Sequence, residues 1–171
     1  GKQEGIDLLL QAVQLIVHYL GRTDIHFGLV GGGTELAAMR QLAKDLDVAD
    51  YVTFTGRVPD AELLEMLNTA DICVNPDRAN DMNDRSTMNK VMEYMALGKP
   101  IVSFDLKETR VSARDAALYV TPNDEAQFAA AISRLMDDPV LCAEMGRYGQ
   151  SRVKTELGWH VTSQNLVRAY D

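Results

Sequence analysis

The alternation of short apolar runs with longer amphipathic segments is the feature that most constrains how this chain folds. The apolar runs are typical of buried strands, and they occupy residues 26–30, 51–55, 72–74, 100–104 and 117–120. Helical spacing of apolar residues predicts helices over residues 6–20, 34–46, 60–68, 86–97, 124–136, 140–156 and 160–169. Strands separated by helices form parallel sheets through right-handed crossovers, and wholly apolar strands indicate helices on both faces. The sequence therefore predicts an α/β fold with a doubly wound parallel sheet, as a single domain over residues 1–171.

The composition favours a globular protein and excludes several classes of partner. The 171 residues hold 17 lysines and arginines against 25 aspartates and glutamates, which gives a net charge of −8. An acidic chain of this kind is not expected to bind nucleic acid or an anionic membrane surface. Two cysteines, Cys73 and Cys142, are too few for a disulfide framework or a cysteine metal cluster. No run approaches the ~18 apolar residues of a membrane span and no secretory leader opens the chain, so we expect a cytoplasmic protein.

Loops that follow the predicted strands are the first place to look for a ligand, because parallel sheets bind ligands at the carboxyl ends of their strands. Residues 31–33 are three glycines between a strand and a helix, so Gly32 and Gly33 can bring backbone amides close to an anion. A tight turn also favours glycine, and the sequence leaves both interpretations open. The dinucleotide fingerprint G-x-G-x-x-G is not matched, because Leu36 occupies its last position. We also expect loops at this edge over residues 56–60, 75–86 and 105–110.

The segment at residues 83–100 carries a second set of candidate binding residues. Its pattern predicts a helix that is capped by Ser86 or Thr87 and whose first-turn amides face the ligand crevice. Further along this helix, the carboxylate of Glu93 can accept hydrogen bonds from two neighbouring hydroxyls, such as those of a ribose. Taken alone, the spacing favours a plainer interpretation, in which Glu93 is solvated or pairs with Lys90.

Several short segments, in order along nearly the whole chain, carry a family resemblance. They are residues 5–10, 29–33, 52–58, 70–74, 92–102, 121–124, 135–139, 145–149 and 158–170. Together they resemble the C-terminal, nucleotide-sugar-binding domain of the GT-B glycosyltransferases of family 4, the glycosyl transferases group 1. The resemblance implies a Rossmann-like domain whose substrate is a nucleoside diphosphate sugar, with no cofactor and no metal.

The E-x7-E pattern of that family assigns roles near the start of the helix at residues 86–97. Its second glutamate, which contacts the ribose, falls on Glu93. Its first glutamate, which contacts the donor sugar, falls on Arg85, so this sequence departs from the pattern. Either Asp84 takes that role, or Arg85 contacts a phosphate or a negatively charged donor sugar.

The resemblance also implies which residues contact the diphosphate and the base of the nucleotide. Backbone amides near Thr87 and Met88 are expected to hold the diphosphate, and the same binding segment includes Ser86 and Asn89. The loop that carries Arg57 and Val58 is expected to line the base.

A second departure from the family lies at the start of the chain. Family members place a lysine directly before the glycine that opens the first helix, whereas Glu4 stands there. Lys2 lies two residues earlier and is the remaining cation for the leaving diphosphate.

The resemblance implies the donor-binding half of a retaining glycosyltransferase, acting in the synthesis of cell-envelope polysaccharide or glycolipid. The acceptor is expected to bind a separate N-terminal domain, which lies outside residues 1–171 together with the first strand of the sheet. The chain by itself is then expected to be inactive, and any peripheral membrane contact belongs to the N-terminal domain. Two alternatives stay open: a nucleotide-sugar epimerase of the same architecture, and a non-catalytic nucleotide-binding module.

Overall fold

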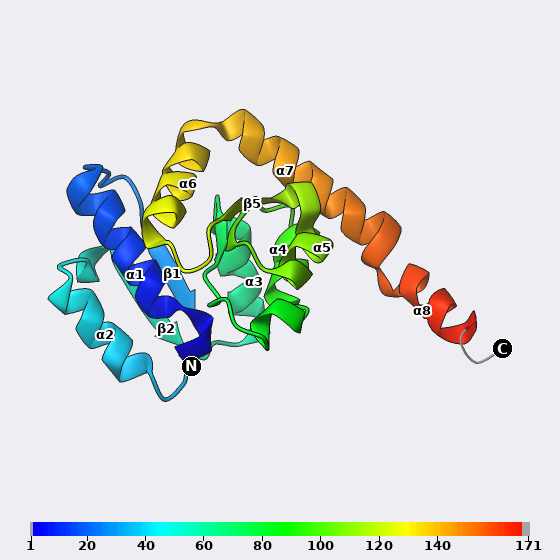
Figure 1. Ribbon diagram of the computed structural model, residues 1–171, viewed down its shortest axis with the longest axis horizontal. Coiled ribbons are helices and arrows are strands. Elements are labelled where there is room, and N and C mark those ends of the chain that lie inside the picture. Colours follow the sequence, from blue (N-terminus) through cyan, green and yellow to red (C-terminus); the bar gives the residue numbers. More distant parts are fainter. Residues whose placement is uncertain (1, 169–171) are drawn as a thin grey trace.

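The computed structural model describes residues 2–168, with side chains described up to residue 163 (Figure 1). The helices are α1 (Ile6–Gln14), α2 (Leu36–Asp45), α3 (Asp60–Thr69), α4 (Asn89–Ala96), α5 (Lys107–Ala113), α6 (Glu125–Asp137), α7 (Pro139–Arg152) and α8 (Trp159–Arg168). The strands are β1 (Phe27–Val30), β2 (Val52–Gly56), β3 (Cys73–Asn75), β4 (Ile101–Phe104) and β5 (Ala117–Val120). Two short 3-10 turns that bear on the site are Lys2–Glu4 and Asn83–Arg85. None of the helices described between residues 2 and 168 is long and apolar enough to cross a membrane.

Parallel pairing of the strands confirms the predicted fold class. β1 pairs with β2, β3 with β4, and β4 with β5, all in the parallel sense. The structure adds a division that the sequence did not predict: β1 and β2 form one sheet, and β3, β4 and β5 form another in that order. Within the described residues, the strand ladder is therefore interrupted between β1 and β3.

One hydrophobic core joins the two sheets. Leu10 and Val13 of α1 have no exposed surface, and neither does Ile16 in the π-helical segment Leu15–Tyr19 that continues it. Phe104 of β4 and Phe128 of α6 continue the same core, with ring centroids 4.9 Å apart. Residues from the strands of both sheets belong to this cluster, so α1 and α6 hold the two sheets in a fixed relation.

Residues 105–110 were predicted to form a loop, and this prediction is wrong for residues 107–110, which belong to helix α5. The helix occupies Lys107–Ala113, and its buried residues are Thr109, Ser112 and Ala113. These side chains are polar or small, so the helix has no apolar stripe that periodicity can detect. Burial against neighbouring elements, rather than local pattern, makes this segment helical.

Carboxylate caps begin the two helices α6 and α7. Asp124 accepts a hydrogen bond from the backbone N–H of Gln127, and Asp138 accepts one from that of Leu141, each over 2.9 Å. Helix α3 begins without a side-chain cap. Pro59 occupies the cap position, and Asp60 is the first residue of the helix.

Candidate functional site

Two glycine-containing loops lie side by side where β1 and β2 end. The backbone N–H of Gly31 donates to the carbonyl oxygen of Gly56 over 2.8 Å. Gly56 has a φ of 74°, a left-handed conformation that glycine adopts without strain. A Cβ atom on Gly32 would lie 3.6 Å from the Cγ atom of Arg57, so the Arg57 stem runs beside the glycine loop. The two loops therefore form one rim, which carries Gly32, Gly33 and Arg57.

A groove of about 990 Å³ opens beside this rim. Parts of β1, β3, α1, α3 and α4 line it. The predicted site residues that line it are Lys2, Gly32, Gly33, Arg57, Val58 and Glu93. Small-molecule sites in proteins occupy roughly 300–1,000 Å³, so the groove has room for a nucleotide. The fold thus brings together residues that are up to 91 positions apart in the sequence.

The positively charged side chains of the groove differ in whether the protein itself already neutralises them. The guanidinium of Arg78 pairs with the carboxylate of Asp7, so it is already neutralised within the protein. Lys2 and Arg57 are exposed, and neither forms an ion pair with another residue among those that the structure describes. These two cations are therefore available to an anionic ligand.

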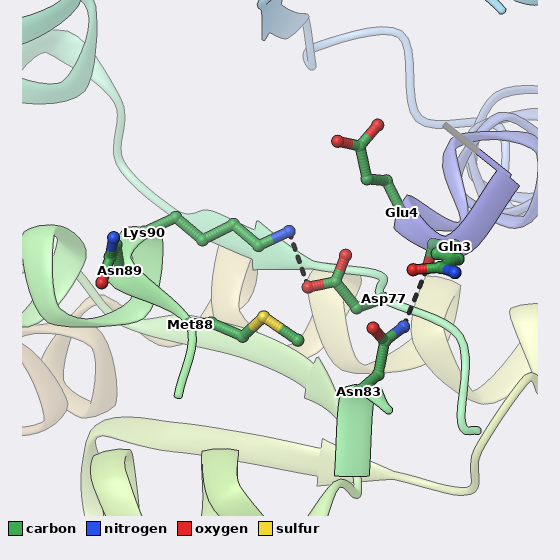
Figure 2. Close-up of a pocket in the computed structure, with 7 residues that line it drawn as sticks. All are labelled: Gln3, Glu4, Asp77, Asn83, Met88, Asn89 and Lys90. Atoms are coloured by element: carbon green, nitrogen blue, oxygen red, sulfur yellow. Dashed lines mark hydrogen bonds and ion pairs between the residues drawn. The ribbon is translucent and has the colours of Figure 1, made fainter. Parts of the chain in front are cut away.

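A smaller hollow of about 330 Å³ adjoins the groove (Figure 2). Glu4 and Lys90 line both spaces, so the two are continuous at these residues. Met88, whose amide was predicted to hold the diphosphate, and Asn89, which belongs to the same predicted binding segment, line the smaller hollow. The start of α4 therefore lies next to the groove.

An ion pair between a partly exposed lysine and a buried carboxylate anchors the start of α4 to the loop after β3. Asp77 is only 4% exposed, and its Oδ2 atom lies 2.8 Å from the Nζ atom of Lys90, as Figure 2 shows. In the same hollow, the side-chain amide of Asn83 donates to the carbonyl oxygen of Gln3 over 3.1 Å. These contacts connect the beginning of the chain to the segment around residues 77–90.

Asp84 and Arg85, the two candidates for the donor-sugar position, share the 3-10 turn Asn83–Arg85. The carboxylate of Asp84 accepts the backbone N–H of Lys107 over 2.8 Å and pairs with the Lys107 ammonium at 2.7 Å. These hydrogen bonds hold the pKa of Asp84 below its usual value. Arg85 is exposed, and neither residue lines the groove or the adjoining hollow. Asp84 thus holds the start of α5, and its contact with a sugar stays a prediction.

The prediction that Ser86 or Thr87 caps α4 is wrong. Met88 occupies the cap position, and no side chain caps the helix there. The Ser86 hydroxyl instead donates to the carbonyl oxygen of Met82 over 2.6 Å. The Thr87 hydroxyl donates to a carboxylate oxygen of Glu108 over 3.3 Å. Both hydroxyls donate hydrogen bonds to groups outside α4, so the helix starts later than the sequence predicted.

Glu93 lies one turn into α4, four residues after Asn89. Its side chain is exposed and lines the groove. Lys90 pairs with Asp77, so the interpretation in which it neutralises Glu93 is wrong, whereas the interpretation of Glu93 as a solvated carboxylate agrees with its exposure. The Glu93 carboxylate is therefore presented to the groove, where it can accept hydrogen bonds from vicinal hydroxyls.

The described residues offer little for nucleophilic or metal chemistry. Burial raises the pKa of the Cys73 thiol to about 12, and burial also raises that of Cys142. Among residues 2–168, no group of three or more histidine, cysteine, aspartate and glutamate side chains is placed to hold a metal ion. The arrangement is suited to binding and to the stabilisation of charge.

Asp77 and Arg78 line the groove or its adjoining hollow, and they lie in the loop predicted at residues 75–86, although neither was predicted to be a site residue. A signal was present, because both residues follow directly after the buried strand that ends at Asn75. Polar residues at that place lie at the carboxyl edge of a parallel sheet.

Known proteins share the sequence pattern of this chain. The family described as "Glycosyl transferases group 1" matches residues 1–138. The GDP-mannose-dependent monoacylated alpha-(1-6)-phosphatidylinositol monomannoside mannosyltransferase of Corynebacterium glutamicum is 28% identical over 170 residues, which cover 96% of this chain and 43% of that protein. The D-inositol 3-phosphate glycosyltransferase of Thermomonospora curvata is 30% identical over 173 residues, covering 96% of this chain and 39% of that protein. The chain thus spans about two fifths of the length of these relatives.

A solved structure shares the fold. Alr3699/HepE of Anabaena, determined in complex with UDP, has a TM-score of 0.86 and 16% identity, and the match covers 99% of this chain and 46% of that one. The parallel sheets and their helices match the Rossmann-like C-terminal domains of GT-B glycosyltransferases. By both sequence and fold, this chain belongs to the glycosyl transferases group 1 family.

Proposed function

We propose that this chain binds the nucleotide part of a nucleoside diphosphate sugar and is the donor-binding half of a retaining glycosyltransferase. The observation that carries the proposal is the convergence of the glycine rim, two available cations and one carboxylate on a single groove. Gly32 and Gly33 offer backbone amides, Lys2 and Arg57 offer positive charge, and Glu93 offers paired acceptors. Backbone amides and cations bind phosphates, and a carboxylate accepts hydrogen bonds from ribose hydroxyls.

In this proposal, different residues of the groove contact the diphosphate, the ribose and the base of the ligand. The rim amides and the two cations hold the diphosphate, and Met88 and Asn89 extend its site into the adjoining hollow. Glu93 accepts the ribose hydroxyls, and Val58 lies against the base. The protein contributes positioning of the donor and stabilisation of the charge that develops on the diphosphate as the glycosidic bond breaks.

The names of related proteins support sugar transfer and a role at the cell envelope. The C. glutamicum relative is named as a GDP-mannose-dependent mannosyltransferase that acts on a phosphatidylinositol mannoside. The Anabaena neighbour was determined with UDP. In our proposal the acceptor binds an N-terminal domain of the whole protein, and the reaction takes place at the cytoplasmic face of the membrane.

Thermal unfolding in the presence of GDP, UDP and ADP tests the binding proposal. At a concentration of 100 times Kd, a ligand that binds only the folded state adds about 2.7 kcal/mol to the free energy of unfolding and raises Tm. We expect one of the three nucleotides to do so at millimolar concentration or below. Arg57→Ala should reduce the shift, whereas Arg134→Ala, on the exposed side of α6, should leave it unchanged. An unchanged Tm with all three nucleotides would contradict the proposal.

A further inference from the structure

One end of the groove lies against α2 and β2, on the side of β1 away from α4 (Figure 1). The residues that line the groove there are Glu35, Leu36, Met39, Phe54 and Val58, and we call this part the α2 end. The proposed diphosphate contacts run from the glycine rim toward the start of α4. The α2 end is therefore the part of the groove that is available to the base.

The α2 end offers an apolar wall to a flat ring. Met39 of α2 and Phe54 of β2 are partly buried and pack on the main core, so the fold fixes their positions. The guanidinium of Arg40 donates to the carbonyl oxygen of Phe54 over 2.9 Å and lies 6.0 Å from the centre of the Phe54 ring. These contacts hold α2 on β2. Sites for small molecules combine such apolar walls with a few polar groups that fix the orientation of the ligand.

Glu35 is the charged residue of the α2 end. It is partly buried and lies two residues after Gly33 of the glycine rim. It occupies the cap position of α2, yet its side chain forms no hydrogen bond to the helix. Among the residues that the structure describes, no hydrogen bond or ion pair satisfies the Glu35 carboxylate. A carboxylate that gives up water without gaining a donor costs free energy, so Glu35 is suited to accept hydrogen bonds from a ligand.

We infer that Glu35 binds the hydrogen-bonding edge of a guanine base, so that the donor of the proposed reaction is a guanosine diphosphate sugar. The inference rests on the proposed function, which leaves the base open. A carboxylate accepts hydrogen bonds through two oxygens and donates none. Guanine carries two neighbouring donors on one edge, the N1–H and the amino group on C2. One glutamate side chain can accept both, in the paired geometry that makes such contacts strong and specific.

The other common bases do not match a carboxylate in this way. Uracil has one donor on the corresponding edge, the N3–H, and a carbonyl oxygen stands on each side of it. Adenine has its amino group next to N1, which is an acceptor. In both cases an acceptor of the base would face an oxygen of Glu35, and two acceptors repel each other. Glu35 therefore favours guanine and also disfavours its competitors, which is how specific sites discriminate.

The competing role for Glu35 is to balance the charge of Arg57, which lines the same groove. In the described part of the chain these two side chains form no ion pair. The two roles differ in their effect on nucleotide affinity. A contact with the base distinguishes one base from another, whereas a partner of Arg57 changes the affinity for every nucleoside diphosphate by the same factor.

Isothermal titration calorimetry of the 171-residue chain with GDP, inosine diphosphate, UDP and ADP tests the inference. We expect GDP to bind about 10- to 100-fold more tightly than UDP or ADP, which is the range for hydrogen bonds to a charged group. Inosine diphosphate keeps the N1–H of guanine but lacks the amino group on C2. It should bind more weakly than GDP and more tightly than UDP.

Two variants assign the preference to one side chain. Glu35→Gln keeps the size of the side chain and replaces one acceptor oxygen with a donor, so it should weaken GDP binding by about tenfold or more and change UDP binding little. Glu62→Gln is the matched control, because it removes the same charge from an exposed position on α3 that does not line the groove. It should keep the preference for GDP. The Tm of each variant without ligand checks that it folds.

The possible outcomes separate this inference from the proposed function. Tighter binding of UDP or ADP than of GDP would overturn the inference and leave the proposed function in place. An equal loss for all four nucleotides in Glu35→Gln would also overturn it, since Glu35 would then balance Arg57. A preference for GDP that survives Glu35→Gln would show that another residue selects the base, and the inference would be wrong. Binding of none of the four would contradict the proposed function and the inference together.

Discussion

Glu93 is the single residue whose replacement best separates ribose binding from other roles. It lies on the groove wall, and its carboxylate forms no ion pair with Lys90. Glu93→Ala should weaken the binding of a nucleoside diphosphate by about 1.5–3 kcal/mol, the contribution of hydrogen bonds to a charged group. Isothermal titration calorimetry with the nucleotide that gives the largest thermal shift measures this difference.

Two controls accompany the Glu93 measurement. A 2′,3′-dideoxy nucleotide lacks both hydroxyls, so the substitution should cost little affinity for it. Glu144→Ala removes an exposed carboxylate from α7, away from the groove, and should not change affinity for either ligand. Equal losses for the normal and the dideoxy nucleotide would show that Glu93 does not contact the ribose.

Cys73 is predicted to be an inert thiol. Its side chain is 5% exposed, and burial raises its pKa to about 12, so almost no thiolate is present near neutral pH. Cys142 is only partly buried and should react first with iodoacetamide at about pH 8. Peptide mass spectrometry in native buffer and in urea measures both rates. Modification of Cys73 at the same rate in both solutions would contradict the burial that the structure shows.

The groove shows which positions of candidate site residues can be predicted from the sequence. Gly32, Gly33 and Glu93 lie where the glycine pattern and the family resemblance indicated, because each depends on its own loop or helix. The partner of Asp84 was not predictable, since Lys107 lies 23 residues away and in a helix without an apolar stripe. Contacts between distant segments leave no periodic trace in the sequence, and they decide which carboxylates are free to bind a ligand.

At the scale of elements, the contact between α4 and α7 depends on glycine. A Cβ atom on Gly146 of α7 would clash with the carbonyl oxygen of Gly98, which lies two residues after the end of α4. Gly146→Ala should lower the free energy of unfolding by about 1–3 kcal/mol, because backbone must move to admit the methyl group. The loss should appear even though alanine favours an isolated helix by about 1 kcal/mol. Urea unfolding measures the change.

The control for this contact lies on the same helix. Ser151→Ala replaces an exposed residue of α7 and should change the free energy of unfolding by no more than about 0.5 kcal/mol. If Gly146→Ala is equally neutral or stabilising, the close packing of α4 on α7 is not required for stability.

Strands and helices with a regular apolar pattern were well predicted, and those without one were not. The run at residues 100–104 became β4, all of whose residues are buried. The start of α4 moved from residue 86 to Asn89, because Ser86 and Thr87 bond outside the helix. An apolar pattern in the sequence indicates which residues are buried. The ends of a helix depend on individual hydrogen bonds, and the apolar pattern does not predict these bonds.

For the whole molecule, the proposed function places the acceptor on a domain outside this chain. In this proposal, amides, cations and a carboxylate that line the groove hold the donor. The chain also spans about two fifths of its glycosyltransferase relatives. A donor site without an acceptor site can bind nucleotide sugar but cannot complete a transfer.

We therefore expect the 171-residue chain to bind nucleotide and to transfer no sugar by itself. The assay incubates the chain with GDP-mannose or UDP-glucose and a lipid extract that supplies acceptors, and it measures the release of nucleoside diphosphate and labelled lipid. Transfer should appear when the N-terminal half of the protein, expressed separately, is added, because the two halves together enclose donor and acceptor. Conversion of the nucleotide sugar to its epimer would indicate an epimerase instead. Sustained transfer by the chain alone would contradict the two-domain proposal, since the chain would then have to supply its own acceptor site.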